Sequence, residues 1–374
     1  MKDACERKPA ECCGRDPDAI GPARQNAAPL VSFIIPTHNY GRYVVEAVES
    51  ALAQTYRSFE IIVVDDGSTD NTPELMAPLQ DRVCYIRQEQ RGPSAARNAG
   101  IKVARGELVA FLDADDVWLP HKTATQVSYL VAHPEIGLVC GRTRRTGNQG
   151  EDQPRIGYRR RRALRKLITL EAGAAFNDLF LRHRNYIATS TVMLRRQCLD
   201  LVGCFDESLS RVEDFNLWLR VARHFGIARL PEILALHRFH ESNLALDREA
   251  MRQAVFDNLE RICSLCPDAA RWRGLAASRL YLKHGLQDLY EGRLQDARCN
   301  LRRAIRSRAL NVTAYPILLA ACCPQAASQA ARSACRVARR WLRAPWRAIA
   351  EKVPCPTRGS SLEQAHKGPP APPR

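Results

Sequence analysis

Short apolar runs alternate with helical patterns through the first part of the chain. Residues 31–35, 60–64, 83–86 and 108–113 are rich in apolar side chains, and continuous runs of this length predict strands buried on both faces. Apolar residues at helical spacing separate the first two runs, and a helical pattern that begins at Gly92 separates the last two. Strands that alternate with helices predict an α/β fold with a mostly parallel sheet covered on both faces.

Acidic residues follow two of the predicted strands. Asp65 and Asp66 come directly after the second strand, and Asp113, Asp115 and Asp116 follow the fourth. The carboxyl ends of parallel strands meet at one edge of a sheet, where α/β proteins bind ligands. Neighbouring carboxylates repel one another unless a cation lies among them, and Mg²⁺ and Mn²⁺ prefer such oxygens together with a diphosphate. One cluster alone is equally compatible with a solvated turn, but two clusters favour nucleotide and metal binding.

Four motifs in sequence order resemble those of the family 2 glycosyltransferases. They are VSFIIPTHN at residues 31–39, VVDDGSTD at 63–70, GPSAARN at 92–98 and DADD at 113–116. Members of this family are inverting enzymes with the GT-A fold, which is a Rossmann-like fold of nucleotide-diphospho-sugar transferases. The resemblance covers roughly residues 29–243, and the part of the chain that follows is expected to be an α-helical extension.

The resemblance implies a metal-dependent glycosyltransferase of the hexosyltransferase type. It would move a sugar from a nucleotide-sugar donor, expected to be a UDP-sugar, to a hydroxyl of a cell-surface glycan or lipid-linked acceptor, in cell-wall or polysaccharide biosynthesis. The Gln-x-x-Arg-Trp signature of processive synthases is absent after Asp214, which favours non-processive transfer. A nucleotidyltransferase with a GT-A-like fold is an alternative, but it has no need of two acids on a late helix.

Site residues follow from the matching motifs. Pro36, His38 and Asp65 are expected to hold the base and ribose of the donor nucleotide, although His38 replaces a Tyr that is common in the family and leaves the base open. The full set expected at the donor nucleotide is Pro36, His38, Asn39, Asp65, Asp66, Arg97 and Asp113. Surface-turn roles for His38 and Asp66 remain open. Arg97 is expected to contact the diphosphate, with an ion pair to Asp65 or Asp113 as the alternative.

The metal and catalytic residues are expected in separate motifs. Asp113 and Asp115 form a DXD motif for Mn²⁺ or Mg²⁺, and His240 is a further candidate metal ligand. Glu213 and Asp214 match the Glu-Asp motif of the family, in which the Asp is the catalytic base that deprotonates the acceptor hydroxyl. They also lie in the first turn of a predicted helix, where acids favour the helix dipole, so a purely structural role is the alternative.

Charge and composition bear on the partners. The net charge of +16 implies an anionic partner, and no acid lies between Asp296 and Glu351, where arginines accumulate beside Trp341 and Trp346. We expect an anionic membrane surface and no nucleic acid, because no nucleic-acid-binding motif is present. A basic nucleic-acid- or membrane-binding protein without catalytic activity would leave the acidic clusters unexplained. The 14 cysteines do not form a disulfide framework, which favours a reducing cytosol.

The expected organisation has four parts. Residues 1–29 are a disordered leader, 30–244 the GT-A domain, 245–352 a basic helical region and 353–374 a disordered tail. Within the helical region, residues 271–289 and 294–306 are expected to form an antiparallel pair. From Ile136, where basic residues begin to appear, we expect a flexible and exposed excursion of the chain. With neither a signal peptide nor a membrane-spanning run, the protein is expected in the cytoplasm, peripherally bound to the inner face of the cytoplasmic membrane.

Overall fold

The computed structural model describes residues 28–147, 166–183, 185–240 and 247–308, together with residues 314, 315, 317 and 318. The chain divides into two compact units, each built from three segments. The first, here called the sheet unit, comprises residues 1–168, 187–217 and 228–246. The second, the helical unit, comprises residues 169–186, 218–227 and 247–374. The expected leader up to residue 27, the arginines of residues 155–165 and the basic segment and tail after residue 318 lie outside the described residues.

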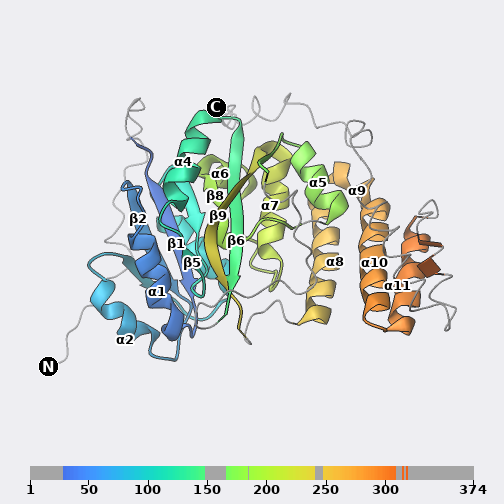
Figure 1. Ribbon diagram of the computed structural model, residues 1–374, viewed down its shortest axis with the longest axis horizontal. Helices are drawn as coiled ribbons and strands as arrows, with labels where there is room; N and C mark the ends of the chain where they lie inside the picture. Colours follow the sequence, from blue (N-terminus) through green and yellow to red (C-terminus); the bar gives the residue numbers. More distant parts are fainter. Residues whose placement is uncertain are drawn as a thin grey trace, which may run out of the picture. The chain divides into compact units, whose positions relative to one another are not determined.

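Within the described residues, nine strands form one sheet (Figure 1). Their order is β3-β2-β1-β4-β8-β6-β9-β5, with β7 pairing β9 off this path. The strands are β1 (Val31–Thr37), β2 (Phe59–Asp65), β3 (Cys84–Arg87), β4 (Leu108–Phe111), β5 (Val117–Trp118), β6 (Ile136–Thr146), β7 (Ile168–Leu170), β8 (Met193–Arg195) and β9 (Gly226–Arg238). The four runs that the apolar pattern predicted correspond to β1, β2, β3 and β4.

The sheet is mixed, with a parallel half and a half that contains antiparallel pairs. β1 pairs in parallel with both β2 and β4, and β2 pairs in parallel with β3. β8 then runs antiparallel to both β4 and β6, and β5 runs antiparallel to β9. The predicted α/β class is confirmed, and the antiparallel strands extend the parallel sheet that the sequence predicted.

The prediction of a flexible excursion from Ile136 is wrong for the residues up to Thr146. These residues form β6, and the first six of them are buried. Arg142 lies within this strand, and its guanidinium donates a hydrogen bond to the backbone oxygen of Pro231 at 3.0 Å. The basic residues made this strand hard to recognise from the sequence. In the structure, Arg142 contacts β9 and the guanidinium of Arg145 lies 4.1 Å from the ring centre of Phe239.

Helices pack on both faces of the parallel half. Phe33 and Ile35 point to one face, where they share a buried cluster with side chains of α1 (Gly41–Leu52). Ile34 points to the other face, toward α3 (Pro93–Val103). A Cβ on Gly100 of α3 would lie 2.6 Å from a methyl carbon of Ile34, so only glycine permits this close approach of helix and strand. The other helices of the sheet unit are α2 (Thr72–Met76), α4 (Lys122–Ala132), α6 (Arg196–Val202) and the short 3₁₀ turns η1 (Ala77–Leu79) and η3 (Thr189–Thr191).

The helical unit contains the predicted helix pair. Residues Arg273–Tyr290 form α10 and residues Leu294–Ser307 form α11, each within two residues of the predicted bounds. The two helices lie side by side (Figure 1) and bury a shared cluster that includes Leu286, Leu289 and Leu301. The unit also contains α5 (Ala174–Arg182), α8 (Arg248–Leu265) and α9 (Pro267–Ala270), while α7 (Glu213–His224) begins in the sheet unit and ends in the helical unit.

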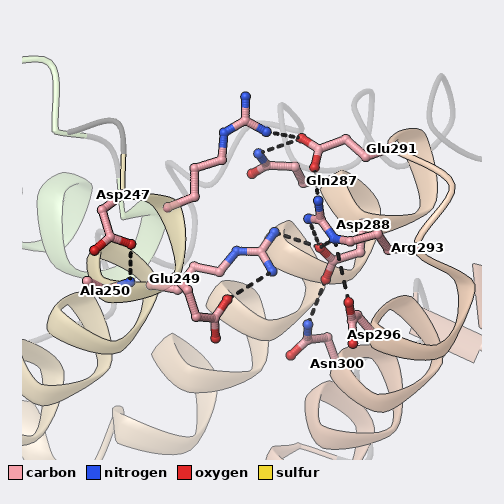
Figure 2. Close-up of polar contacts among 11 residues, drawn as sticks. Asp247, Glu249, Ala250, Gln287, Asp288, Glu291, Arg293, Asp296 and Asn300 are labelled. Atoms are coloured by element: carbon pink, nitrogen blue, oxygen red, sulfur yellow. Dashed lines mark hydrogen bonds and ion pairs between the residues drawn. The ribbon is translucent and has the colours of Figure 1, made fainter. Parts of the chain in front are cut away.

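A buried carboxylate joins three of these helices (Figure 2). Asp288 of α10 has no exposed side-chain surface and accepts hydrogen bonds from Arg252 of α8 at 2.6 Å and from Asn300 of α11 at 2.8 Å. Arg293, in the turn before α11, also donates to it. Among the described residues, no helix is both long enough and apolar enough to span a bilayer.

Candidate active site

The expected donor-binding residues lie together at the carboxyl ends of β1 and β2. Asp65 is fully buried, and its two oxygens accept hydrogen bonds from the backbone N–H of Ser68 at 2.8 Å and from the hydroxyl of Tyr85 at 2.6 Å. Burial and this contact with Asp65 raise the pKa of Tyr85 well above its ordinary value. Asp66 accepts from the side chain of Gln88 and from two backbone N–H groups, so both carboxylates shape the turns around them.

His38 and Asn39 tie the turn after β1 to the turn after β2. Nδ1 of His38 donates to the backbone oxygen of Asp66 at 2.8 Å. The side-chain oxygen of Asn39, a residue with a φ of 55°, accepts from the backbone N–H of Thr69 at 2.8 Å. Pro36 pairs with Val64 one residue before these turns. The sequence therefore predicted correctly that these residues are neighbours, and their contact with a nucleotide stays a prediction.

Arg97 bridges two acids, Asp113 and Glu213, that lie 100 residues apart in the sequence. One guanidinium nitrogen donates to Asp113 at 2.8 Å and another donates to Glu213 at 2.7 Å, and the residue is 6% exposed. The contact with Asp113 is the ion pair that the sequence left open as an alternative. Because Asp113 follows β4 and Glu213 begins α7, the bridge brings the DXD motif and the Glu-Asp motif into one site.

Asp115 and His240 form a second pair. Nε2 of His240 lies 2.9 Å from a carboxylate oxygen of Asp115, and both side chains are largely buried. Burial, followed by the charges of Asp116 and Asp113, raises the pKa of Asp115 to about 7. Burial, followed by nearby cations that include Arg42, lowers the pKa of His240, which favours the neutral imidazole that binds metals.

The donor set fits a hard divalent cation that keeps part of its shell from the substrate. Within the described residues, no group of three His, Cys, Asp or Glu side chains is arranged to hold a metal ion. Asp115 and His240 offer one oxygen and one nitrogen, and Asp113 adds a carboxylate of which Oδ1 accepts a hydrogen bond from Arg97. Mg²⁺ and Mn²⁺ sites with one or two protein carboxylates plus phosphate oxygens have this composition, and a cation would relieve the repulsion that raises the pKa of Asp115.

Asp214 has a different environment from the acids after β4. It is in the first turn of α7, and its oxygens accept hydrogen bonds from the hydroxyl of Thr189 at 3.1 Å and from the backbone N–H of Phe215 at 2.6 Å. Burial, followed by the neighbouring charge of Glu213, raises the pKa of Asp214 to about 6, although Arg97 opposes this shift. A carboxylate with a raised pKa is a stronger base, as proton abstraction from a hydroxyl requires.

Sequence reasoning missed several residues that organise this site. The hydroxyl of Ser190 donates to Asp116 at 2.6 Å, and Thr189 holds Asp214. Nδ1 of His237 lies 3.0 Å from Asp116. Residues 189–191 lie in a short 3₁₀ turn between apolar residues, and nothing in their pattern points to a site. His237 stands in the segment that contains His240, but spacing alone does not reveal a carboxylate 121 positions earlier in the chain.

The sequence of the chain is similar to known proteins. The family model described as Glycosyl transferase family 2 matches residues 32–196. An uncharacterized glycosyltransferase of Rickettsia typhi is 32% identical over 239 residues, which is 62% of this chain and 72% of that protein.

The fold is similar to that of solved structures. TarS of S. aureus, residues 1–349 in complex with UDP-GlcNAc, matches with a TM-score of 0.55 and 19% identity, over 83% of this chain and 92% of that one. The mannosyltransferase PcManGT from Pyrobaculum calidifontis, in complex with GDP-Man and Mn²⁺, matches with a TM-score of 0.52 and 21% identity, over 84% of this chain and 88% of that one. At this level of identity the likeness establishes the fold, which agrees with the predicted class.

Proposed function

Because the chain belongs to glycosyl transferase family 2 and is therefore a glycosyltransferase, we propose that it is metal-dependent, inverting and non-processive. In this proposal it transfers one sugar from a UDP-sugar to a hydroxyl of a cell-surface glycan or a lipid-linked acceptor. The observation that carries the proposal is the Arg97 bridge, which unites in one site an acid cluster suited to a diphosphate and its cation with a buried carboxylate suited to act as a base.

The two kinds of carboxylate have separate tasks in the proposed reaction. Asp214 takes the proton of the acceptor hydroxyl while the oxygen of that hydroxyl forms a bond to the anomeric carbon of the sugar. The bond from the anomeric carbon to the diphosphate breaks on the opposite side, and its electron pair stays on the diphosphate oxygen. Asp115 and His240, with Asp113, would hold Mn²⁺ or Mg²⁺, whose charge stabilises the departing diphosphate when the ion is bound.

The turns after β1 and β2 would hold the nucleotide. Pro36, His38, Asn39, Asp65 and Asp66 lie together there. Both oxygens of Asp65 and Oδ2 of Asp66 each accept one hydrogen bond from the protein and can accept a further one. The UDP-GlcNAc complex of TarS supports a uridine donor, and the Mn²⁺ complex of PcManGT supports a divalent cation.

An anionic surface is the proposed working environment. The chain carries a net charge of +16, and α11 exposes Arg302, Arg303 and Arg306. We propose peripheral binding at the inner face of the cytoplasmic membrane, where each cation near an anionic leaflet contributes about 1 kcal/mol of binding free energy. An acceptor in cell-wall or polysaccharide biosynthesis fits that location.

Release of nucleoside diphosphate from a panel of nucleotide sugars tests the proposal. One donor should give slow release with Mn²⁺ or Mg²⁺, and chelator should abolish it. The Asp115→Asn variant should lose at least about 100-fold of this activity, because it removes charge from the proposed cation site. Asp81→Asn, at an exposed position away from the site, is the matched control and should keep wild-type activity. Wild-type protein that binds no nucleoside diphosphate with any of these metals would contradict the proposal.

A further inference from the structure

Each of the three acids after β4 is matched with its own basic side chain. Asp113 pairs with Arg97, Asp115 pairs with His240, and Asp116 pairs with a third partner, His237. The reaction proposed above uses the first two pairs. The third pair, Asp116 and His237, has no part in that reaction.

Asp116 is buried and accepts hydrogen bonds from three other groups of the protein. It is 3% exposed and accepts hydrogen bonds from the hydroxyl of Ser190 at 2.6 Å and from the backbone N–H of Arg238 at 3.1 Å, in addition to Nδ1 of His237 at 3.0 Å. A carboxylate with three donors has little capacity left for a metal ion. Its arrangement is that of an acid that fixes the orientation and the protonation of an imidazole.

The outer edge of the His237 ring is available to a ligand. Its side chain is 43% exposed, and Nε2, separated from Nδ1 by one ring carbon, is the nitrogen that does not face Asp116. Among the described residues Nε2 has no hydrogen-bond partner. Burial lowers the pKa of His237, but the contact with Asp116 outweighs this effect and raises the pKa to about 9. At neutral pH, Nε2 therefore carries a proton and a share of the positive charge.

A purely structural role for His237 duplicates contacts that already exist. The backbone N–H of Arg238 reaches Asp116, and β5 pairs with β9 through Val117 and Leu236, so the acidic turn is already fixed to β9. Neither contact needs an imidazole. His237 contacts the residue that follows Asp115, and His240, the partner of Asp115, is three residues further along the chain. His237 thus belongs to the same cluster of side chains as the proposed cation site.

We propose that His237, oriented by Asp116, is a hydrogen-bond donor to the diphosphate of the nucleotide donor, directed at the phosphate that bears the sugar. The inference rests on the proposed glycosyl transfer. When the bond between the anomeric carbon and the phosphate oxygen breaks, its electron pair stays on the phosphate, and the N–H of His237 stabilises that charge without giving up its proton. The acceptor proton still goes to Asp214. Asp116 is thus a positioning residue, and His237 touches the substrate.

Binding of UDP and of UMP in Mn²⁺ buffer, measured by calorimetry, tests this assignment. UMP lacks the phosphate that His237 would contact. His237→Phe should therefore weaken UDP about 10- to 100-fold, the usual effect of a charge-assisted hydrogen bond, and leave UMP within about twofold of wild type. His237→Gln keeps a hydrogen-bond donor without the charge, so its affinity for UDP should lie between those of wild type and His237→Phe. Asp116→Asn should lower the preference for UDP over UMP in the same direction, whereas His121→Gln, at an exposed position, should match wild type.

The remaining outcomes separate the alternatives. Equal losses of UDP and UMP in His237→Phe would mean that the residue only supports the fold of the site, and unchanged UDP binding would mean that it makes no contact with the diphosphate. A weaker affinity of this variant for Mn²⁺ alone would mean that it acts through the cation. Each of these results overturns the assignment. Failure of the wild type to bind UDP at all would instead contradict the proposed function.

Discussion

At the scale of single residues, the acid that matters most for the proposed chemistry is tuned by its neighbours. Asp214 is faced by the carboxylate of Glu213 on its own helix, by Arg97 from α3 and by the hydroxyl of Thr189. Burial and Glu213 raise the pKa of Asp214, and Arg97 lowers it, with a result of about 6. The base strength of the site therefore depends on the charge on each side of this carboxylate.

This environment predicts an acidic limit to activity. A base works only when it is deprotonated, so kcat/KM should fall as pH drops through about 6, instead of through the ordinary range of a carboxyl group near 4. Glu213→Gln removes a negative neighbour, which lowers the pKa of Asp214 and should move this limit to lower pH. Transfer rates measured from pH 4.5 to pH 8 for both proteins check the prediction. A limit that stays in place or moves upward in Glu213→Gln would show that Asp214 is not the titrating base.

The sequence motifs indicate most residues of the candidate site, but only part of their contacts with one another. Asp65, Asp115 and Asp214 belong to short motifs, which can be recognised from the sequence alone. The pairing of Asp116 with His237 and the hydroxyls of Thr189 and Ser190 depends on how β8, β9 and the acidic turn meet in space. These contacts arise between segments that are distant in sequence, and no local spacing encodes them.

At the scale of elements, the helices of the helical unit depend on one buried charge. Asp288 has two guanidinium partners and one amide partner, which come from α8, from the turn before α11 and from α11 itself (Figure 2). A buried carboxylate is costly to desolvate, but removing it deprives Arg252 and Arg293 of their buried partner. The ion network thus fixes how these three helices pack, while the apolar cluster of α10 and α11 supplies the bulk of the stabilisation.

Removing this carboxylate should destabilise the helical unit strongly. Asp288→Ala is expected to lower the free energy of unfolding by about 3 kcal/mol, because Arg252 and Arg293 lose a buried partner. Asp296→Ala is the matched control, since Asp296 is 61% exposed and only 3.5 Å from Arg293, and should change stability by less than about 0.5 kcal/mol. Urea unfolding followed by circular dichroism measures both. Equal effects of the two substitutions would show that burial of Asp288 is unimportant.

Elements with one dominant pattern were predictable, and elements with mixed signals were not. β1, β2 and β4 are mostly apolar because helices cover both of their faces. The helices α10 and α11 are separated by the turn at Gly292, which has a φ of 81°. β6 carries three arginines in its second half, and β8 is only three residues long. The conformation of such strands depends on pairing with neighbouring strands, and the local sequence does not reveal which strands are neighbours.

At the scale of the whole molecule, two buried histidines make stability depend on pH. Burial lowers the pKa of both His183 and His284 to about 4, from an ordinary value near 6.5. Between these values the unfolded chain binds protons that the folded chain does not. The free energy of unfolding is therefore unaffected by these histidines above pH 6.5, and it decreases progressively as pH falls toward 4.

The expected loss is measurable well before acid unfolding. At pH 5.5 each histidine should cost up to about 1 kcal/mol of unfolding free energy relative to pH 7.5. The double variant His183→Gln, His284→Gln removes both groups, so its urea midpoint should change less than that of the wild type between these pH values. If the urea midpoints of the two proteins change equally with pH, the two histidines do not account for the pH dependence of stability. The exposed His121 offers a control, since His121→Gln should keep the wild-type slope.

The discontinuous segments of the two units also have a consequence for synthesis of the chain. β9 separates β6 from β5 in the sheet, yet it ends 92 residues after β6 does. At roughly 5 to 20 residues per second, a ribosome needs on the order of 5 to 20 s to complete that interval. During this time the strands already made have an open edge, which is a template for pairing with other chains. The nascent chain should therefore be most in need of a chaperone between the emergence of β6 and that of β9.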